Sequence, residues 1–258
     1  MLRFSANISM LFCERPFLER FAAARDAGFD AVEMQFPYDM PVADIVAARE
    51  AAGIDFVVFN LPVGDMTRGG PGLASVPGRE DGFRAAVADG LRFARALKPR
   101  NINVLAGWPP AEMAPARCFE TLVSNVRLAA EAMAEIGVRV TVEAVNTRDR
   151  PGYFLSRTQD AVAVIEAANH ANLGLEHDLY HMQIMEGDLI PTLTRYRDKI
   201  AHIQFADTPG RHQPGTGEIN FAGVFAAIED LGYTGWLGAE YHPTGRTEDS
   251  LGWMRSYL

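Results

Sequence analysis

Short apolar runs alternate with longer stretches of helical periodicity along the whole chain. The runs are rich in Val, Ile and Phe, which is typical of strands buried in a parallel sheet. The stretches between them repeat apolar residues every three or four positions, which predicts amphipathic helices. Several of these stretches close on a glycine, as at Gly28 and Gly53, where a helix would end. We expect strands at 4–9, 30–36, 55–60, 102–107, 138–146, 172–178, 201–207 and 236–241.

The helical stretches fall between these strands, one after each. Eight strand–helix units, with no linker and no change in composition, predict an α/β fold that is a single (β/α)8 TIM barrel, with residues 1–258 forming one domain. An open, doubly wound sheet is the alternative, because a count of strands does not establish closure. We expect helices at 14–28, 41–53, 79–98, 112–136, 158–170, 188–198, 221–231 and 246–257.

Composition and charge narrow the class of protein. Of the 258 residues, 48% are hydrophobic and 22% charged, which is ordinary for a soluble globular protein. The formal net charge of −9, without a run of Lys or Arg, argues against nucleic acid as a partner. Cys13 and Cys118 lack metal-ligand spacing and do not suggest a disulfide scaffold. Without a signal peptide or a membrane-length apolar run, we expect a soluble cytoplasmic protein that does not bind membranes.

The segment 64–80, GDMTRGGPGLASVPGRE, is the one stretch of low complexity. It lacks the G-x-x-x-x-G-K-[ST] spacing of a phosphate loop, and we expect no nucleotide cofactor. Long loops after barrel strands often cover the active site. The segment is therefore either a flexible connection or a lid, and the sequence does not decide between them.

Oxygen-bearing side chains end the last four expected strands. Glu143 ends the fifth strand and Asp178 the sixth, while Gln204 and Glu240 lie near the ends of the seventh and eighth. In a barrel these positions meet at one mouth, where three carboxylates would repel one another unless a cation joined them. Acidic residues can instead cap helices or pair with Arg. Four oxygen-bearing side chains in register, however, favour a metal site. The oxygen ligands predict Mg²⁺ or Mn²⁺, with Co²⁺ and Zn²⁺ left open.

The sequence as a whole resembles the hydroxypyruvate isomerases of the xylose isomerase-like TIM barrel superfamily. A close branch of that family acts on 2-oxo-tetronate, a four-carbon homologue of hydroxypyruvate. The resemblance runs from end to end through ordered segments, which makes it more specific than a single motif. These segments are RFSANISMLF (3–12), FPYDM (36–40), PGRE (77–80), DLYHMQIMEG (178–187), PGTGEINF (214–221) and GYTGW (232–236).

The resemblance implies roles for the residues at the mouth. Glu143, Asp178, Gln204 and Glu240 stand where the family has its metal ligands. Glu143 and Glu240 also stand where it has its acid/base pair. The implied reaction is an aldose–ketose type isomerisation of hydroxypyruvate to tartronate semialdehyde. A metal-bound enediolate would be its intermediate, with the two glutamates removing and returning the proton.

Three further residues are expected to contact the substrate. His181 resembles a substrate-facing histidine of the related ketose epimerases, and Arg211 is a candidate anchor for a substrate anion. The family often has lysine after the Glu-Tyr of the eighth strand, whereas this chain has His242. A histidine in that place would make carboxylate binding depend on pH. We assign the aromatic residues Phe59, Trp108, Trp236 and Trp253 to packing, although rings near the mouth could shield the intermediate.

Several other functions fit the same motifs. The same site could act on 2-oxo-tetronate, or serve a ketose 3-epimerase, although those epimerases usually carry histidine where Gln204 stands. A barrel endonuclease needs a histidine-rich zinc cluster and a basic groove, and neither is evident. A non-catalytic sugar-acid binding protein would need no pair of carboxylates on one ion. The expected partner is a short 2-oxo sugar acid, and a homo-oligomer is left open.

Overall fold

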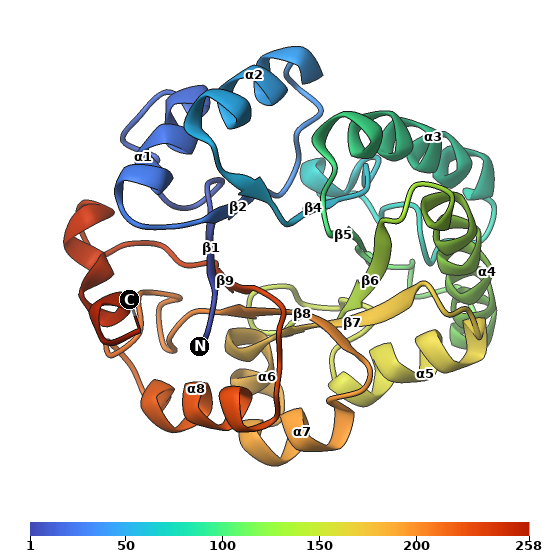
Figure 1. Cartoon of the computed structure of the whole chain (residues 1–258). Helices are drawn as coiled ribbons and strands as arrows, with labels where there is room; N and C mark the ends of the chain where they lie inside the picture. The colour runs from blue at the N-terminus through green and yellow to red at the C-terminus, as the bar shows by residue number, and fades with distance from the viewer. Residues whose placement is uncertain (258) are drawn as a thin grey trace.

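The computed structural model describes residues 1–257, which form a nearly closed (β/α)8 barrel (Figure 1). All paired strands are parallel, in the order β3-β2-β1-β9-β8-β7-β6-β5-β4. Each of the eight expected strands is confirmed, and the third is divided into β3 and β4. The strands are β1 (Phe4–Asn7), β2 (Ala31–Glu33), β3 (Asp55–Phe56), β4 (Val58–Asn60), β5 (Asn101–Val104), β6 (Arg139–Glu143), β7 (Leu173–Asp178), β8 (Ile200–Phe205) and β9 (Leu237–Ala239).

The chain itself closes the ring at the division between β3 and β4. Strand β3 pairs with β2, and strand β4 pairs with β5. Val57 lies between β3 and β4. The amide of Val57 donates to the carbonyl of Val32 (2.8 Å), and the amide of Met34 donates to the carbonyl of Val58 (3.2 Å). The alternative of an open, doubly wound sheet is therefore wrong.

Helices surround the strands on the outside of the barrel (Figure 1). Seven of the expected helical regions contain an α-helix, and the last region, 246–257, forms a 3₁₀-helix instead. The α-helices are α1 (Arg20–Asp26), α2 (Val42–Ala52), α3 (Glu80–Leu97), α4 (Pro115–Ala134), α5 (Thr158–Ala168), α6 (Leu179–Met185), α7 (Leu189–Tyr196) and α8 (Phe221–Asp230), and the 3₁₀-helices are η1 (Phe17–Glu19), η2 (Met66–Arg68) and η3 (Glu248–Ser256).

Helix α6 was not predicted, and it starts directly from a strand end. Asp178 is both the last residue of β7 and the N-cap of α6, and its Oδ1 accepts from the amide of Tyr180 (2.7 Å). No turn residue separates strand from helix, which is why the sequence pattern did not reveal it. The cap fixes the Asp178 carboxylate at the mouth of the barrel.

The helices bury the faces that their periodicity predicts. In α3, for example, Phe83, Val87, Ala94 and Leu97 recur at spacings that place them on one side, and all are buried. None of the helices in residues 1–257 has the length and apolar character needed to cross a membrane. Both cysteines are free within this range: Cys118 is buried and Cys13 is exposed.

Strand register brings two of the expected site residues, Asp178 and Gln204, to one level. Asp178 of β7 pairs with Gln204 of β8, which in turn pairs with Gly238 of β9. Gly238 has no side chain, and a Cβ there would lie 2.4 Å from the carboxylate oxygens of Glu33 on β2. The glycine therefore leaves room for a buried carboxylate beneath the mouth.

Candidate active site

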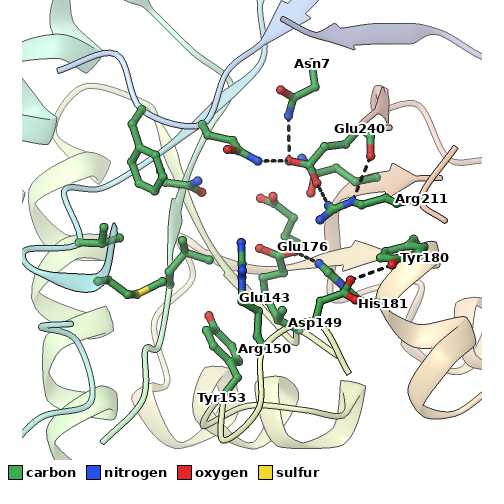
Figure 2. Close-up of a pocket in the computed structure, with 18 of the residues that line it drawn as sticks. Asn7, Glu143, Asp149, Arg150, Tyr153, Glu176, Tyr180, His181, Arg211 and Glu240 are labelled. Carbon is green, nitrogen blue, oxygen red and sulfur yellow. Dashed lines mark hydrogen bonds and ion pairs between the residues drawn. The ribbon is translucent and has the colours of Figure 1, made fainter. Parts of the chain in front are cut away.

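A cavity of about 1090 Å³ lies at the carboxyl ends of the strands (Figure 2). Asp178 is almost fully buried behind its wall, and its carboxylate approaches His181 and Arg211. The structure therefore brings all seven sequence-predicted residues to one cavity. Those that line it directly are Glu143, His181, Gln204, Arg211, Glu240 and His242.

The expected metal-ligand atoms converge only in part. Glu143 Oε1 and Asp178 Oδ2 lie 3.8 Å and 3.5 Å from the Nε2 atom of His181, and the three atoms lie within 4.8 Å of one another. The Nε2 atom of Gln204 donates to Glu33 Oε1 (2.8 Å). The side-chain oxygen of Gln204 is therefore the atom that could bind a metal ion. Three carboxylates and an amide oxygen are a donor set that fits a hard divalent cation.

Arg211 lies between two of the expected ligands. Its Nη2 atom contacts Asp178 Oδ2 (3.3 Å) and Glu240 Oε2, and its guanidinium lies 5.0 Å from the centre of the Tyr180 ring. The charge of Arg211 is thus already compensated by two carboxylates and an aromatic face. From the sequence, we expected a metal ion to supply the positive charge between these carboxylates. In this structure, Arg211 supplies part of that charge.

Burial and mutual repulsion perturb the carboxyl groups. Burial raises the pKa of Glu143 well above its usual value, and the charges of Glu240 and Asp178 raise it further. Burial also raises the pKa of Glu240, and it raises the pKa of Asp178 to about 7, against the opposing charge of Arg211 in both cases. Arg211 alone therefore does not keep all three groups ionised, and the cluster fits an additional cation.

The hydrogen bonds around Asn146 define the tautomer of His181. The Oδ1 atom of Asn146 accepts from the amide of Asp149 (2.7 Å), so its Nδ2 is the atom that faces His181 Nδ1 (2.6 Å). An amide nitrogen only donates, and Nδ1 must therefore accept, which leaves the ring proton on Nε2. Burial and the charges of Arg211 and Arg150 lower the pKa of His181 well below 6.5. His181 is therefore a neutral hydrogen-bond donor that presents its Nε2–H to the cavity. In this tautomer its Nε2 atom is not a ligand for a metal ion.

Neutral amides from neighbouring strands and from the end of β2 hold one oxygen of each glutamate. Asn103 donates to Glu143 Oε2 (2.9 Å), and both Asn7 (2.9 Å) and Gln35 (3.1 Å) donate to Glu240 Oε1. The other oxygen of each glutamate is turned toward a cation or a donor, His181 for Glu143 and Arg211 for Glu240. Sequence reasoning missed these amides because Asn and Gln at strand ends carry no distinctive signal.

A buried glutamate beneath the site was also missed. Glu33 is fully buried and accepts hydrogen bonds from Ser5 (3.0 Å), His202 (2.9 Å), Gln204 (2.8 Å) and Asn7 (3.3 Å). It ties Gln204 to Asn7, which in turn contacts Glu240. The same signal that singled out Glu143, a carboxylate in an apolar run, was present in DAVEMQF.

Glu176 forms a second buried carboxyl group at the base of the cavity. It lies opposite Glu143 in the β6–β7 pairing, and Thr141 donates to its Oε2 (2.7 Å). Burial, followed by the charge of Glu143, raises the pKa of Glu176 well above its usual value. The raised pKa favours the protonated form of Glu176, in which the group adds no charge to the cluster.

The segment 64–80 forms part of the cavity wall. Met66 lines the cavity, and the Asp65–Arg79 ion pair (2.9 Å) joins the two ends of the segment. Its Pro71 carbonyl accepts from the amide of Trp108 (2.9 Å), which ties it to the loop after β5. The segment thus covers one side of the site, and whether it opens as a lid stays a prediction.

Two aromatic residues that we assigned to packing also line the cavity, namely Phe59 and Trp108. Trp253 does pack, with its ring centre 5.2 Å from that of Phe205. His242 stands at the mouth, where burial and the nearby Arg211 and His212 lower its pKa. A neutral His242 is a poor replacement for a lysine that would hold a carboxylate.

Comparisons with known proteins identify the family of this chain. Residues 21–257 match the family described as xylose isomerase-like TIM barrel. The chain is 45% identical to 2-oxo-tetronate isomerase of Cupriavidus necator, over 100% of this chain and 99% of the relative. It is 44% identical to hydroxypyruvate isomerase of Escherichia coli, over the full length of both.

A solved structure described as AP endonuclease, family 2, from Brucella melitensis superposes with a TM-score of 0.97 at 41% identity, covering 100% of this chain and 99% of the other. The fold and the full-length relatives agree with one another. The chain belongs to the xylose isomerase-like TIM barrel family, and it is an isomerase of the branch that contains these hydroxypyruvate and 2-oxo-tetronate isomerases.

Proposed function

We propose that the protein interconverts hydroxypyruvate and tartronate semialdehyde with the help of a divalent metal ion. The observation that carries the proposal is the arrangement of Glu143 and Glu240 in one cavity. Each glutamate has one oxygen held by neutral amides and a second oxygen directed toward cations and donors. Such a pair is suited to removing a proton from one carbon and returning it to the next.

The metal would be held by Glu143, Asp178, Gln204 and Glu240, and Mg²⁺ or Mn²⁺ suits these oxygen ligands. When bound, it would polarise the substrate carbonyl and stabilise the negative charge that develops during proton removal. The hydrogen bond from Gln204 to Glu33 (2.8 Å) supports this ligand set, because it turns the amide nitrogen away and leaves the oxygen for the ion.

The chain's own groups carry the proton transfers. One of the two glutamates removes a proton from C3 of hydroxypyruvate, and the other delivers a proton to C2. The hydroxyl proton on O3 is lost as the aldehyde forms, and O2 gains one, so the product is an isomer of the substrate. The Nε2–H of neutral His181 and the guanidinium of Arg211 would donate to the substrate oxygens where negative charge develops.

The second candidate is isomerisation of 2-oxo-tetronate. The Cupriavidus necator and Escherichia coli relatives differ by one percentage point in identity to this chain, so their identity does not rank the two substrates. The cavity of about 1090 Å³ leaves space for one more carbon. We favour hydroxypyruvate because the DLYHMQIMEG and PGTGEINF segments resemble hydroxypyruvate isomerases.

Proton exchange in D₂O tests the proposal. Metal-loaded protein is incubated with hydroxypyruvate, 2-oxo-tetronate or a ketose, and product and deuterium are followed by NMR. EDTA-treated protein and Glu240→Gln serve as controls. We expect tartronate semialdehyde with deuterium at C2, formed only by metal-loaded wild type. Turnover of 2-oxo-tetronate or a ketose alone would change the substrate, and no exchange with any of them would favour a binding protein.

An endonuclease control belongs in the same experiment because of the description of the Brucella melitensis structure. The metal-loaded protein is incubated with a DNA duplex that contains an abasic site. We expect no cleavage, since the chain carries a net charge of −9. Metal-dependent cleavage without isomerase activity would contradict the proposal.

A further inference from the structure

In the proposed reaction, the carboxylate of the substrate requires a cation. The cluster of Glu143, Asp178, Glu240 and Arg211, called here the catalytic cluster, does not supply one. Hydroxypyruvate and 2-oxo-tetronate each carry a carboxylate, and a buried carboxylate needs a positive partner. Arg211 was the sequence-based candidate, but its guanidinium already contacts the carboxylates of Asp178 and Glu240. His242 is no better suited, since its pKa is lowered by burial and by Arg211.

Two other arginines line the same cavity, both in the loop between β6 and α5: Arg148 and Arg150. Within residues 1–257, the guanidinium of Arg150 makes neither an ion pair nor a hydrogen bond, and its backbone alone is engaged. Figure 2 shows Arg150 among the side chains that extend into the cavity. Arg150 lines the cavity together with Glu143 and His181.

The loop holds Arg150 in place from both sides. Its amide donates to the carbonyl of Asn146 (3.1 Å), and its carbonyl accepts from the amide of Tyr153 (3.1 Å). The neighbouring Asp149 accepts from Asn146 (3.0 Å) and from the hydroxyl of Tyr180 (2.7 Å). The backbone that carries Arg150 is therefore ordered before a ligand arrives, which lowers the cost of binding.

We propose that Arg150 is the anchor for the substrate carboxylate and makes the site selective for short 2-oxo acids over neutral ketoses. The inference rests on the proposed function for its substrate class. A guanidinium matches a carboxylate with two parallel hydrogen bonds, which fixes orientation as well as position. With C1 held at Arg150, C2 and C3 are left to Glu143 and Glu240.

A pair of substrates that differ only at the carboxylate tests the anchor. Dihydroxyacetone has the hydroxymethyl ketone of hydroxypyruvate but a neutral CH₂OH in place of the carboxylate, and the same proton transfer converts it to glyceraldehyde. In Arg150→Gln, we expect KM for hydroxypyruvate to rise by about 10- to 100-fold, as for the loss of a charged hydrogen-bonded pair. The kcat/KM for dihydroxyacetone should change by less than about twofold, which also shows that the variant is folded.

The matched control is Arg148→Gln, which changes the same kind of residue in the same loop and cavity. We expect both substrates to be turned over as in the wild type. Arg150→Lys keeps the charge without the bidentate geometry and should have an intermediate KM for hydroxypyruvate. An equal loss on both substrates in Arg150→Gln would overturn the inference, as would a loss on hydroxypyruvate in Arg148→Gln alone.

Binding of D-glycerate separates this inference from the proposed function. This acid keeps the carboxylate but has no carbonyl to isomerise, and its affinity for Mn²⁺-loaded protein is measured by calorimetry. Weaker binding to Arg150→Gln than to wild type would support the anchor even if hydroxypyruvate were not turned over, in which case only the proposed function fails. Equal binding to both proteins would overturn the anchor even if hydroxypyruvate were turned over.

Discussion

On the side of the cavity formed by β1 to β5, neutral amides hold the glutamates, whereas on the side formed by β6 to β9 the polar groups are carboxylates, an arginine and a histidine. Asn7 and Gln35 donate to Glu240, and Asn103 donates to Glu143, where the two sides adjoin at the β1–β9 and β5–β6 pairs. The charged half supplies the groups that can react. The amide half decides which oxygen of each group faces the substrate, because an amide occupies the other one.

One pair of residues reverses this division. Glu33 contributes a carboxylate from the amide half, and Gln204 contributes an amide from the charged half. They meet in a hydrogen bond of 2.8 Å. The reversal allows the amide of Gln204 to present its oxygen to the same centre as the carboxylates. A neutral ligand there adds no further negative charge to a crowded cluster.

The largest expected effect is loss of a reacting group in the charged half. Glu143→Gln and Glu240→Gln should each lower kcat for hydroxypyruvate by about 10²- to 10⁴-fold, the range for a lost general acid or base. Steady-state rates by NMR, with metal content measured for each variant, provide the test. Glu135→Gln, on the surface, is the matched control. A loss below about tenfold in either site variant would mean that the glutamate does not transfer a proton.

The next effect concerns the reversed pair. Glu33→Gln removes the charged acceptor that orients Gln204, and we expect metal affinity to fall by about 10- to 100-fold, as for other residues that support a metal ligand. Titration with Mn²⁺ measures the affinity, and excess Mn²⁺ should restore most of kcat. Unchanged metal affinity in a folded variant would show that Glu33 has only a structural role.

A smaller effect is expected from the amide half. Asn103→Ala removes the donor to Glu143 Oε2, and kcat should fall by about tenfold, the typical weight of a hydrogen bond to a charged group. The bond from Asn103 lowers the pKa of Glu143, so its loss should shift the pH profile to higher pH. Asn172→Ala, which alters an asparagine outside the cavity, is the comparison. A pH profile that does not move would contradict the orienting role.

The smallest expected effect is on stability. The folded pKa of Asp178, raised to about 7 from an unfolded value of 3.8, means that the folded state binds the proton more tightly. The stability of metal-free protein should therefore be highest at low pH and fall as pH rises through about 7. Bound metal should remove most of this decline. Thermal unfolding between pH 5.5 and 8, with EDTA or with Mn²⁺, checks the slope, and a rise in metal-free stability with pH would contradict it.

The difference between the charged half and the amide half also explains which site residues could be predicted from the sequence. The alternation of apolar runs and helical stretches predicted every strand, and acidic residues at strand ends predicted Glu143, Asp178 and Glu240. Asn7 and Asn103 could not be found this way, because a neutral amide in a strand is common and its partner lies on or just after another strand that is far away in the sequence. Their role depends on pairing between distant strands, which local pattern does not encode.

Arg150 was missed for a different reason. It lies in the loop NTRDRPGY, where two arginines stand two positions apart, and no periodicity tells that they line the cavity or which of them would hold a substrate. Hydrogen bonds from Asn146, Asp149 and Tyr153 order the loop at Arg150, and they appear only in the folded structure. A cytoplasmic location stays a prediction from the sequence, and the oligomeric state stays open.

The most direct test of the account follows deuterium at C3 of hydroxypyruvate in Glu143→Gln and Glu240→Gln, both with metal bound. The account assigns each glutamate to one carbon. It therefore predicts that one variant loses solvent exchange at C3, while the other keeps that exchange but forms no tartronate semialdehyde. Identical behaviour of the two variants, with both exchange and isomerisation retained, would contradict the account.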